Sequence, residues 1–593
     1  MTGKSDSITP RLFRSTMFTM LAAELSGAVA AVIDGILTGS FLGPVSLAAF
    51  GVGTPYFSIA CIVSGILTVG CSSLCTRAVG KGDVEETSRV FSLTVFLGAA
   101  MSLVLAAGGT IFAGSLSSLF GAGASGSELH RLTADYLRGV FPVAPAFILF
   151  VILTPVLQID GDYSRPRIAS LIMSVADIAG DLLNIFVFKG GMLGMGLATS
   201  AGHYIALFVL LTHFFKKSTL FCFSFRLLRF RNTFALMRDG LPRALCMLCR
   251  GLLPILLNNL AMTLAGNEGV AAYSTLTSIS FTVGALGWGI GGAVLVMGGL
   301  AAGEQNRHGM KVTVISALKN ILFGVVPIAV AVFAAAPLIS SMFNPDPGNV
   351  RDMATMAIRC YGIALPFLAF NVSAANHLQN ISRMKGSYAV NICIEFGATA
   401  LMALILHGFM GINGIWAAFP AGQALLSLSI VAVSFIFRKK DQKGRKGFEA
   451  WLMLKKDFGV PEEDCINRSV STIDEVASLS SDIVDFCTER GFGRKEANRL
   501  SLCIEEMAGN VIEHGFSDGK NHHLDIRVYA KDGKLGLRLR DDCPRFDFKK
   551  KAEDWTFDPE HPEHNIGIRL AMKAASDISY TNTMKTNNLI VVI

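Results

Sequence analysis

Charged residues are scarce in this 593-residue chain, at 16% of the total against about 25% in a typical soluble protein. The scarcity is uneven, because residues 1–440 contain only 47 charged residues whereas residues 461–593 contain 42. A protein that is soluble throughout is therefore excluded. The composition instead predicts a polytopic membrane protein followed by a soluble domain.

Two further absences narrow the function. The chain has no Gly-x-x-x-x-Gly-Lys-Ser/Thr loop, since Gly3-Lys4-Ser5 lacks the upstream glycine, which argues against an ATP-driven pump built on that phosphate-binding loop. It also has no basic stripe with interleaved aromatic residues, so no nucleic acid partner is expected. The 12 cysteines do not form the pattern of a disulfide framework.

Long apolar runs dominate the first part of the chain. A run of about 20 apolar residues is long enough to cross the hydrocarbon core of a bilayer. We expect twelve α-helical spans, roughly at 16–40, 51–75, 90–112, 135–157, 168–189, 194–214, 241–265, 271–300, 313–340, 357–379, 387–407 and 413–437.

Lysine and arginine gather in alternate loops. The basic loops are 76–89, 158–167, 215–240, 301–312 and 380–386. The positive-inside rule predicts that these loops, both termini and the C-terminal domain lie in the cytoplasm. The chain is thus expected to be a multi-pass protein of the cytoplasmic (inner) membrane of a bacterium.

The spans repeat internally. The segment Gly43–Phe50 aligns with Gly266–Tyr273 at an offset of 223 residues. Because each half holds six spans, an even number, the halves (1–225 and 226–440) share one membrane orientation and form a parallel repeat. Such repeats are typical of transporters with a central site and rocking halves; a duplicated scaffold without transport is the alternative.

Acidic residues within apolar spans are costly, so each is a candidate functional group. Asp34 lies in the first span, and Asp177, Asp181 and Asn184 share one face of the fifth. Glu395 lies in the eleventh span, 218 residues after Asp177. A carboxylate in a low dielectric prefers a proton or a cation as partner. These residues therefore predict a site that exchanges a proton or a sodium ion for a cationic substrate.

The transporter part resembles the MATE (multidrug and toxic compound extrusion) family over about residues 10–438. The resemblance is carried by Asp34-Gly-Ile-Leu-Thr-Gly-x-x-Leu-Gly-x-x-x-Leu-Ala-Ala, Gly80-Lys-Gly-Asp83, Asp239-Gly-Leu-Pro242 and Leu183-Asn184-Ile185. It implies export of organic cations or drugs in antiport against sodium or protons. Asp34 and Asn184 match family positions, whereas Phe188 stands where the family often has an acid.

The tail begins with a basic linker at 441–460, which anionic lipid is expected to attract; a simple positive-inside flank is the alternative. Residues 461–593 then alternate between segments with the two-residue periodicity of strands and segments with the helical periodicity of about 3.6 residues. Strands are predicted at 466–470, 524–529, 535–540 and 589–593, and helices at 473–488, 494–514 and 565–576. This pattern predicts an α+β domain with helices on one face of a largely antiparallel sheet.

Three clusters in the tail suggest nucleotide chemistry. Glu506 and Asn510 are four residues apart on a predicted helix, where a carboxylate and an amide can orient Mg²⁺ on phosphates and a nucleophile's proton. Asp541 ends a strand and can accept an adenine amino hydrogen. Asn565 and Gly567 open a helix whose free N–H groups suit phosphate.

In this order the clusters resemble the GHKL ATP-binding fold, and most of all the anti-sigma-factor serine kinases. The resemblance implies that the domain is a GHKL-type sandwich with ATP and Mg²⁺ as cofactors. It also implies that Glu506 is the catalytic acid, Asn510 the magnesium ligand, Asp541 the adenine-binding acid and Gly567 the second glycine of the lid.

The tail departs from the GHKL pattern at two positions. Cys543 stands where glycine is usual, and Asn565 replaces the first lid glycine. The resemblance further implies a partner with a phosphorylatable serine, such as an anti-anti-sigma-like protein.

The hypothesis for the whole chain is a cation-coupled exporter of organic cations or drugs with an ATP-binding, kinase-like regulatory domain. The alternative is a membrane sensor whose spans control that domain; whether the tail is an enzyme stays open.

Overall fold

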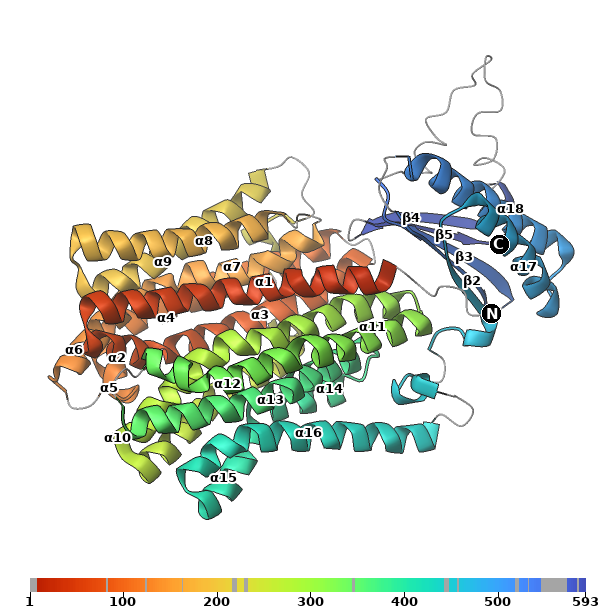
Figure 1. Ribbon diagram of the computed structural model, residues 1–593. Helices are drawn as coiled ribbons and strands as arrows, with labels where there is room; N and C mark the ends of the chain where they lie inside the picture. The colour runs from red at the N-terminus through yellow and green to blue at the C-terminus, as the bar shows by residue number, and fades with distance from the viewer. Residues whose placement is uncertain are drawn as a thin grey trace.

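A computed structural model of the chain has two parts, a long helical bundle and a small α+β domain at one end of it (Figure 1). We call that end of the bundle the tail-side end. The structure describes residues 8–80, 84–122, 125–160, 162, 164–215, 221–228, 233–343, 347–441, 447–455, 458–517, 522–531, 533–544, 573–583 and 586–593.

The bundle consists of helices at the predicted places. The first half contains α1 (Ile8–Leu37), α2 (Pro44–Gly53), α3 (Pro55–Gly80), α4 (Val84–Ile111), α5 (Ala113–Leu119), α6 (Glu128–Val140), α7 (Ala144–Ile159), α8 (Ser164–Leu183) and α9 (Gly191–Leu211). The second half contains α10 (Thr233–Gly303), α11 (Arg307–Asn320), α12 (Val326–Phe343), α13 (Asn349–Asn380), α14 (Met384–Ile392), α15 (Ala398–Met410) and α16 (Ile412–Asp441).

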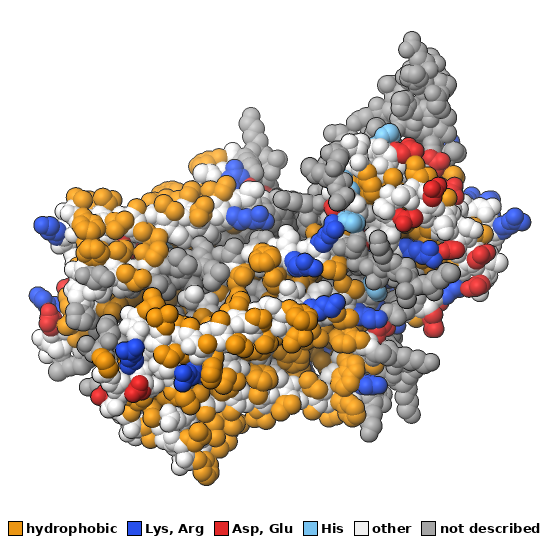
Figure 2. Space-filling view, viewed as in Figure 1, with side chains coloured by type: hydrophobic (Ala, Val, Ile, Leu, Met, Phe, Trp, Pro, Cys, Tyr) orange, Lys and Arg blue, Asp and Glu red, His pale blue; other side chains and the backbone are white. Residues whose placement is uncertain are grey.

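Eleven helical segments among the described residues are long and apolar enough to cross a membrane, and α1 covers the first of the twelve predicted spans. Large apolar side chains cover the outside of the bundle, as Figure 2 shows, for example Val104 at 74%, Phe323 at 75% and Leu428 at 68% exposed. Apolar surface on this scale fits lipid contact rather than water.

Two equivalent glycines mark the predicted repeat. Gly43, between α1 and α2, has φ 93°, and Gly266, within α10, has φ 59°. Gly266 divides α10 into two helices that meet at a sharp bend. Positive φ suits glycine because it has no Cβ. The chain therefore turns at the same point of each half, which supports the internal repeat.

The tail folds as a five-stranded sheet beside two helices. The sheet, with strand order β1-β2-β3-β5-β4, is antiparallel throughout. Its elements are β1 (Cys465–Val470), α17 (Ile473–Glu489), α18 (Arg494–Asn510), β2 (Leu524–Lys531), β3 (Lys534–Asp541), β4 (Asp577–Thr583) and β5 (Thr586–Val592). The α+β prediction is confirmed, but the edge strand β4 was missed because its mostly polar sequence lacks apolar alternation. Most of the predicted helix 565–576 lies outside the described residues.

Every second side chain of β3 points into the core of the tail. Leu535, Leu537 and Leu539 face α17 and α18, and each is at most 1% exposed. We expect Leu537→Ala to destabilise the domain by about 2–5 kcal/mol, because it removes a buried side chain and leaves a cavity. Urea unfolding of the fragment 458–593 measures this loss. Lys534→Ala, at an exposed position of the same strand, is the control; equal stability of both variants would contradict the assignment.

The linker packs on the bundle. Leu452, Met453 and Leu454 are buried within the core of the second half. Their backbone is held there, since Nε2 of His377 lies 2.8 Å from the Leu452 carbonyl and Nε of Arg383 donates to Met453 over 2.9 Å. The apolar residues of the linker thus fasten the tail to the second half, and the attraction of its basic residues to anionic lipid stays a prediction.

Candidate ion-binding and nucleotide-binding sites

Three carboxylates meet inside the first half. Asp34 on α1 and Asp177 on α8 are each 7% exposed, and Asp181, one turn further along α8, is 1% exposed. They lie close enough for their charges to act on one another. The helical spacing predicted from the sequence places Asp177 and Asp181 on the face of α8 that meets α1.

These carboxylates lack cationic partners. Both oxygens of Asp181, and one oxygen each of Asp34 and Asp177, are buried without a hydrogen-bond partner among the described residues. The hydroxyl oxygens of Thr38 and Tyr56 are likewise buried without a hydrogen-bond partner among the described residues. Buried polar atoms are rarely left unpaired. The arrangement is therefore suited to a proton, a cation or water that satisfies them.

Sequence reasoning missed two neighbours of this site. Tyr136 on α6 is 1% exposed and lies within electrostatic reach of all three carboxylates. Thr199 on α9 is the polar neighbour of Asp177. Helix α9 approaches closely because Gly202 packs on the backbone of α8, where a Cβ atom would lie 3.2 Å from the Asp177 nitrogen. Neither residue carries a charge, so the search for ionisable groups in spans passed over both.

Asn184 serves the turn after α8. It begins a π-helical turn, η3 (Asn184–Phe188). Its Oδ1 accepts from the Gly190 nitrogen over 3.1 Å, and its Nδ2 donates to the Gly191 carbonyl over 3.0 Å. The side-chain amide of Asn184 thus bonds to the backbone of the turn after α8. Its role at the ion site stays a prediction.

Glu395 has a different environment from Asp177, its counterpart in the repeat. It lies on η8 (Cys393–Gly397), with Oε2 3.9 Å from Nε of Arg250. Arg250 in turn lies over the ring of Trp288, 5.9 Å from its centroid. Arg250 thus provides a cation beside this partly buried acid of the second half, whereas no described residue provides one to the carboxylates of the first half.

Some other buried polar groups of the second half are paired with one another, whereas Oδ1 of Asn258 and Nε of Arg359 are buried without a hydrogen-bond partner among the described residues. Nδ2 of Asn371 donates to Oε1 of Gln423 over 2.9 Å, and the Ser427 hydroxyl donates to Oδ1 of Asn371 over 2.8 Å. A fully paired network of this kind stabilises packing. The cluster of three carboxylates lies in the first half, and the role of Glu395 at an ion site stays a prediction.

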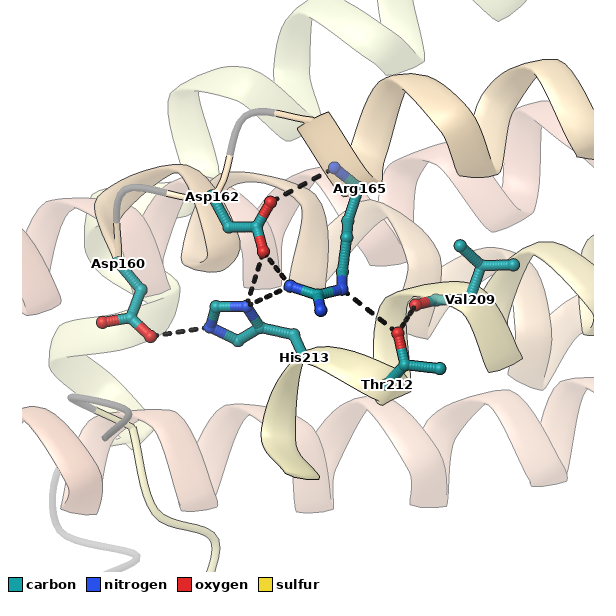
Figure 3. A network of polar contacts seen from close by, with 6 residues as sticks. All are labelled: Asp160, Asp162, Arg165, Val209, Thr212 and His213. Carbon is teal, nitrogen blue, oxygen red and sulfur yellow. Dashed lines mark hydrogen bonds and ion pairs between the residues drawn. The ribbon is translucent and has the colours of Figure 1, made fainter. Parts of the chain in front are cut away.

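A separate polar network lies at the tail-side end of the first half (Figure 3). His213 places Nε2 2.6 Å from Asp160 and Nδ1 3.0 Å from Asp162. Arg165 bonds to Asp162 and donates from Nε to the Thr212 hydroxyl over 3.1 Å. Because both ring nitrogens face carboxylates, the imidazole donates to both only when it is protonated. The network connects the loop after α7 to the residues that follow α9.

In the tail, the two neighbouring glutamates of α18 have different surroundings. Glu505 accepts from the Ser480 hydroxyl of α17 over 2.5 Å, so it joins the two helices. Nδ2 of Asn510 donates to the Glu506 carbonyl over 2.5 Å. This leaves the side-chain oxygen of Asn510 and the carboxylate of Glu506 as the two groups that fit a magnesium ion, which prefers oxygen ligands.

Asp541 ends β3 in a buried position, 4% exposed. It accepts from the Cys543 nitrogen over 3.0 Å and from Nδ2 of Asn587 over 2.8 Å. Burial raises the pKa of Asp541 above its ordinary value, and these hydrogen bonds offset part of the rise. The carboxyl is thereby fixed in place, as direct recognition of one edge of a base requires.

Two further observations concern the nucleotide site. The predicted lid residues Asn565 and Gly567 lie outside the described residues. The donor atoms of His522, Asp542 and Cys543 lie within 4.8 Å of one another, which is close enough to hold a metal ion.

Comparison with known proteins identifies both parts. The sequence profile of the MatE family matches residues 20–183 and 242–404, more than half of the chain. The chain belongs to the MatE family. The profile of the histidine kinase-like ATPase domain matches residues 470–593, so the GHKL assignment of the tail is also confirmed.

Relatives of this MatE protein include curated exporters. The multidrug export protein MepA of Staphylococcus aureus (strain bovine RF122 / ET3-1) is 23% identical over 445 residues, covering 72% of this chain and 95% of the relative. MepA of Staphylococcus saprophyticus is 24% identical over 431 residues, covering 70% and 92%.

Solved structures agree on the fold of the bundle. A multidrug resistance MATE family transporter in its inward-facing conformation has a TM-score of 0.59 at 22% identity and covers 70% of this chain and 96% of that chain. The outward-facing conformation has a TM-score of 0.61 at 22% identity, with 71% and 94% covered. At this identity the likeness establishes the MATE fold alone.

Proposed function

We propose that the bundle is a cation-coupled antiporter that exports organic cations or other drug-like molecules across the cytoplasmic membrane, with the tail in the cytoplasm. The observation that carries the proposal is the trio of Asp34, Asp177 and Asp181, buried without a cationic partner among the described residues. Groups of this kind favour a proton or a metal cation. The name of the MepA relatives supports drug-like substrates.

Transport in proteoliposomes tests this proposal. An imposed sodium gradient and an imposed pH gradient, applied one at a time, should reveal which ion drives uptake of a quaternary ammonium dye. Coupling requires dye movement that collapses when the driving gradient is dissipated. If neither gradient moves the dye or other drug-like cations, the antiport proposal fails.

We propose that the tail binds ATP through Asp541 and Mg²⁺ through Asn510. With Glu506 as the catalytic acid, it either phosphorylates a serine or threonine on a partner or gates transport. The buried, twice hydrogen-bonded carboxyl of Asp541 supports adenine recognition. The lid positions Asn565 and Gly567 are proposed phosphate contacts. An anti-anti-sigma-like protein is the proposed partner for phosphotransfer.

Glu506→Gln tests the chemical role of the tail. We expect phosphotransfer to fall about 10²–10⁴-fold, the usual contribution of a positioned general base, while ATP binding persists because Gln keeps the shape of Glu. Single-turnover transfer from labelled ATP measures the rate. Glu505→Gln is the matched control, since Glu505 bonds to Ser480 instead. Unchanged transfer in the Glu506 variant would remove it from the reaction.

A sensor is the second candidate, in which the spans bind a ligand and control the tail without net transport. The extensive contact between tail and bundle favours it, since a signal then has a direct route. The gradient experiment separates the two candidates, because a sensor binds the dye without gradient-driven uptake.

A further inference from the structure

One face of the tail sheet is buried although neither of the described tail helices, α17 and α18, covers it. Strands β2 and β3 point Asp525, Arg527, Arg538 and Arg540 away from α17 and α18, by the two-residue alternation of a strand. These side chains are nevertheless only 3–6% exposed. In Figure 1 this face of the sheet is turned toward the tail-side end of the bundle, and Asp525, Arg538 and Arg540 bond to residues there.

The first contact of this face is with the turn between α10 and α11. Glu304 lies there, and its two carboxylate oxygens bond separately to Arg538 and Arg540. Beside them, Lys531 bonds to Gln305. Arg307 donates from Nε to the Phe458 carbonyl over 2.5 Å. Together with the buried linker, these bonds attach the tail to the second half.

The second contact is with α1, which also reaches into the other half. Oδ2 of Asp525 accepts from the Ile8 nitrogen over 3.1 Å, and Thr9, Glu304 and Arg540 line one small cavity. The start of α1 packs in the core of the second half through Phe13. At its other end, α1 carries Asp34 against α8 of the first half. The sheet face therefore spans the seam between α1 and the α10–α11 turn.

We propose that this sheet face is a clamp that holds the start of α1 against the α10–α11 turn, and that it must release α1 each time the transporter opens toward the tail. The inference rests on the proposed transport function. Rocking of the halves separates their ends at one side of the membrane. A domain fixed to the second half and bonded to α1 opposes that separation.

The charge on the clamp face suits reversible contact. Arg527 lies opposite Arg538 in the sheet and forms no ion pair with any described residue. Its contacts are Cys465 Sγ at 3.8 Å and the Tyr529 ring at 5.3 Å. A surplus buried cation makes the closed contact weaker than a balanced pair would. Strand β3 also carries Asp541, which directly follows Arg540. The clamp and the proposed nucleotide contact therefore lie on the same strand.

Paired cysteines test the clamp in the full chain. A short thiol-reactive cross-linker between Ile8→Cys and Asp525→Cys should lower dye transport about tenfold or more, because the opening step is blocked. The matched control joins Gln305→Cys to Lys531→Cys, which ties the tail to the half that already carries it and should leave transport unchanged. Single-cysteine variants correct for reaction at native cysteines. Equal transport by both cross-linked pairs overturns the proposal.

A second measurement needs no transport. Glu304→Arg should raise hydrogen exchange at the start of α1 and along β3, because the clamp loses its anchor, whereas Arg468→Glu should not; Arg468 pairs with Asp482 on the helix side of the sheet. Unchanged exchange in the Glu304 variant overturns the clamp. If no variant moves dye but exchange rises as expected, the transport proposal fails and the contact between sheet and α1 stands.

Discussion

Asp34→Asn should abolish gradient-driven export. Asparagine has the shape of aspartate but no charge, so the buried trio loses one of its attractions for a cation and cannot take up a proton at that position. Removing one member of a buried charge interaction costs about 2–5 kcal/mol, which is about 30-fold or more in affinity. Dye uptake driven by the coupling gradient in proteoliposomes measures the loss.

The structure provides a control for this variant. Asp135 is a half-exposed aspartate of α6 that pairs with Arg138 over 2.7 Å, so Asp135→Asn removes one negative charge from the same half without touching the site. Dye binding should persist in the Asp34 variant because Asp177 and Asp181 remain to attract a cation, while its coupling to the gradient disappears. Normal coupling in Asp34→Asn would remove this residue from the ion site.

Asp541→Asn should remove ATP binding by the tail. An amide presents a donor where the adenine amino group needs an acceptor, and a hydrogen bond to a charged group contributes about 1.5–3 kcal/mol. The loss corresponds to about 10–100-fold in affinity. Calorimetric titration of the purified full chain with Mg-ATP measures it. Asparagine retains an oxygen for the Cys543 nitrogen and for Asn587, so the fold should persist.

Asp542→Asn is the control for the nucleotide site. Asp542 follows Asp541 directly, but its Oδ1 accepts from the His523 nitrogen over 2.9 Å, away from the proposed adenine contact. If Asp541→Asn and Asp542→Asn lost ATP affinity equally, the loss would reflect negative charge alone and not the position of Asp541. Tight binding by Asp541→Asn would make the tail something other than a nucleotide domain of this type.

The sequence alone determined the features that depend on local pattern. Span length and hydropathy predicted the helices, and helical spacing placed Asp177 and Asp181 together. The 223-residue offset predicted the internal repeat, which the equivalent bends at Gly43 and Gly266 support. The tail's sheet and helices followed from the switch between two periodicities, because each element carries its own apolar face. The polar edge strand β4 was missed for the same reason, since it carries little such pattern.

Only the tertiary structure decided which groups meet. The pairs Asp525 with Ile8 and Arg540 with Glu304 join positions 517 and 236 residues apart, and no local periodicity encodes such distances. Glu395 lies beside Arg250, whereas the three carboxylates of the other half have no cationic partner among the described residues, and this difference likewise depends on how helices pack. A sequence specifies its elements through neighbouring residues, whereas a site depends on which faces come into contact once those elements assemble.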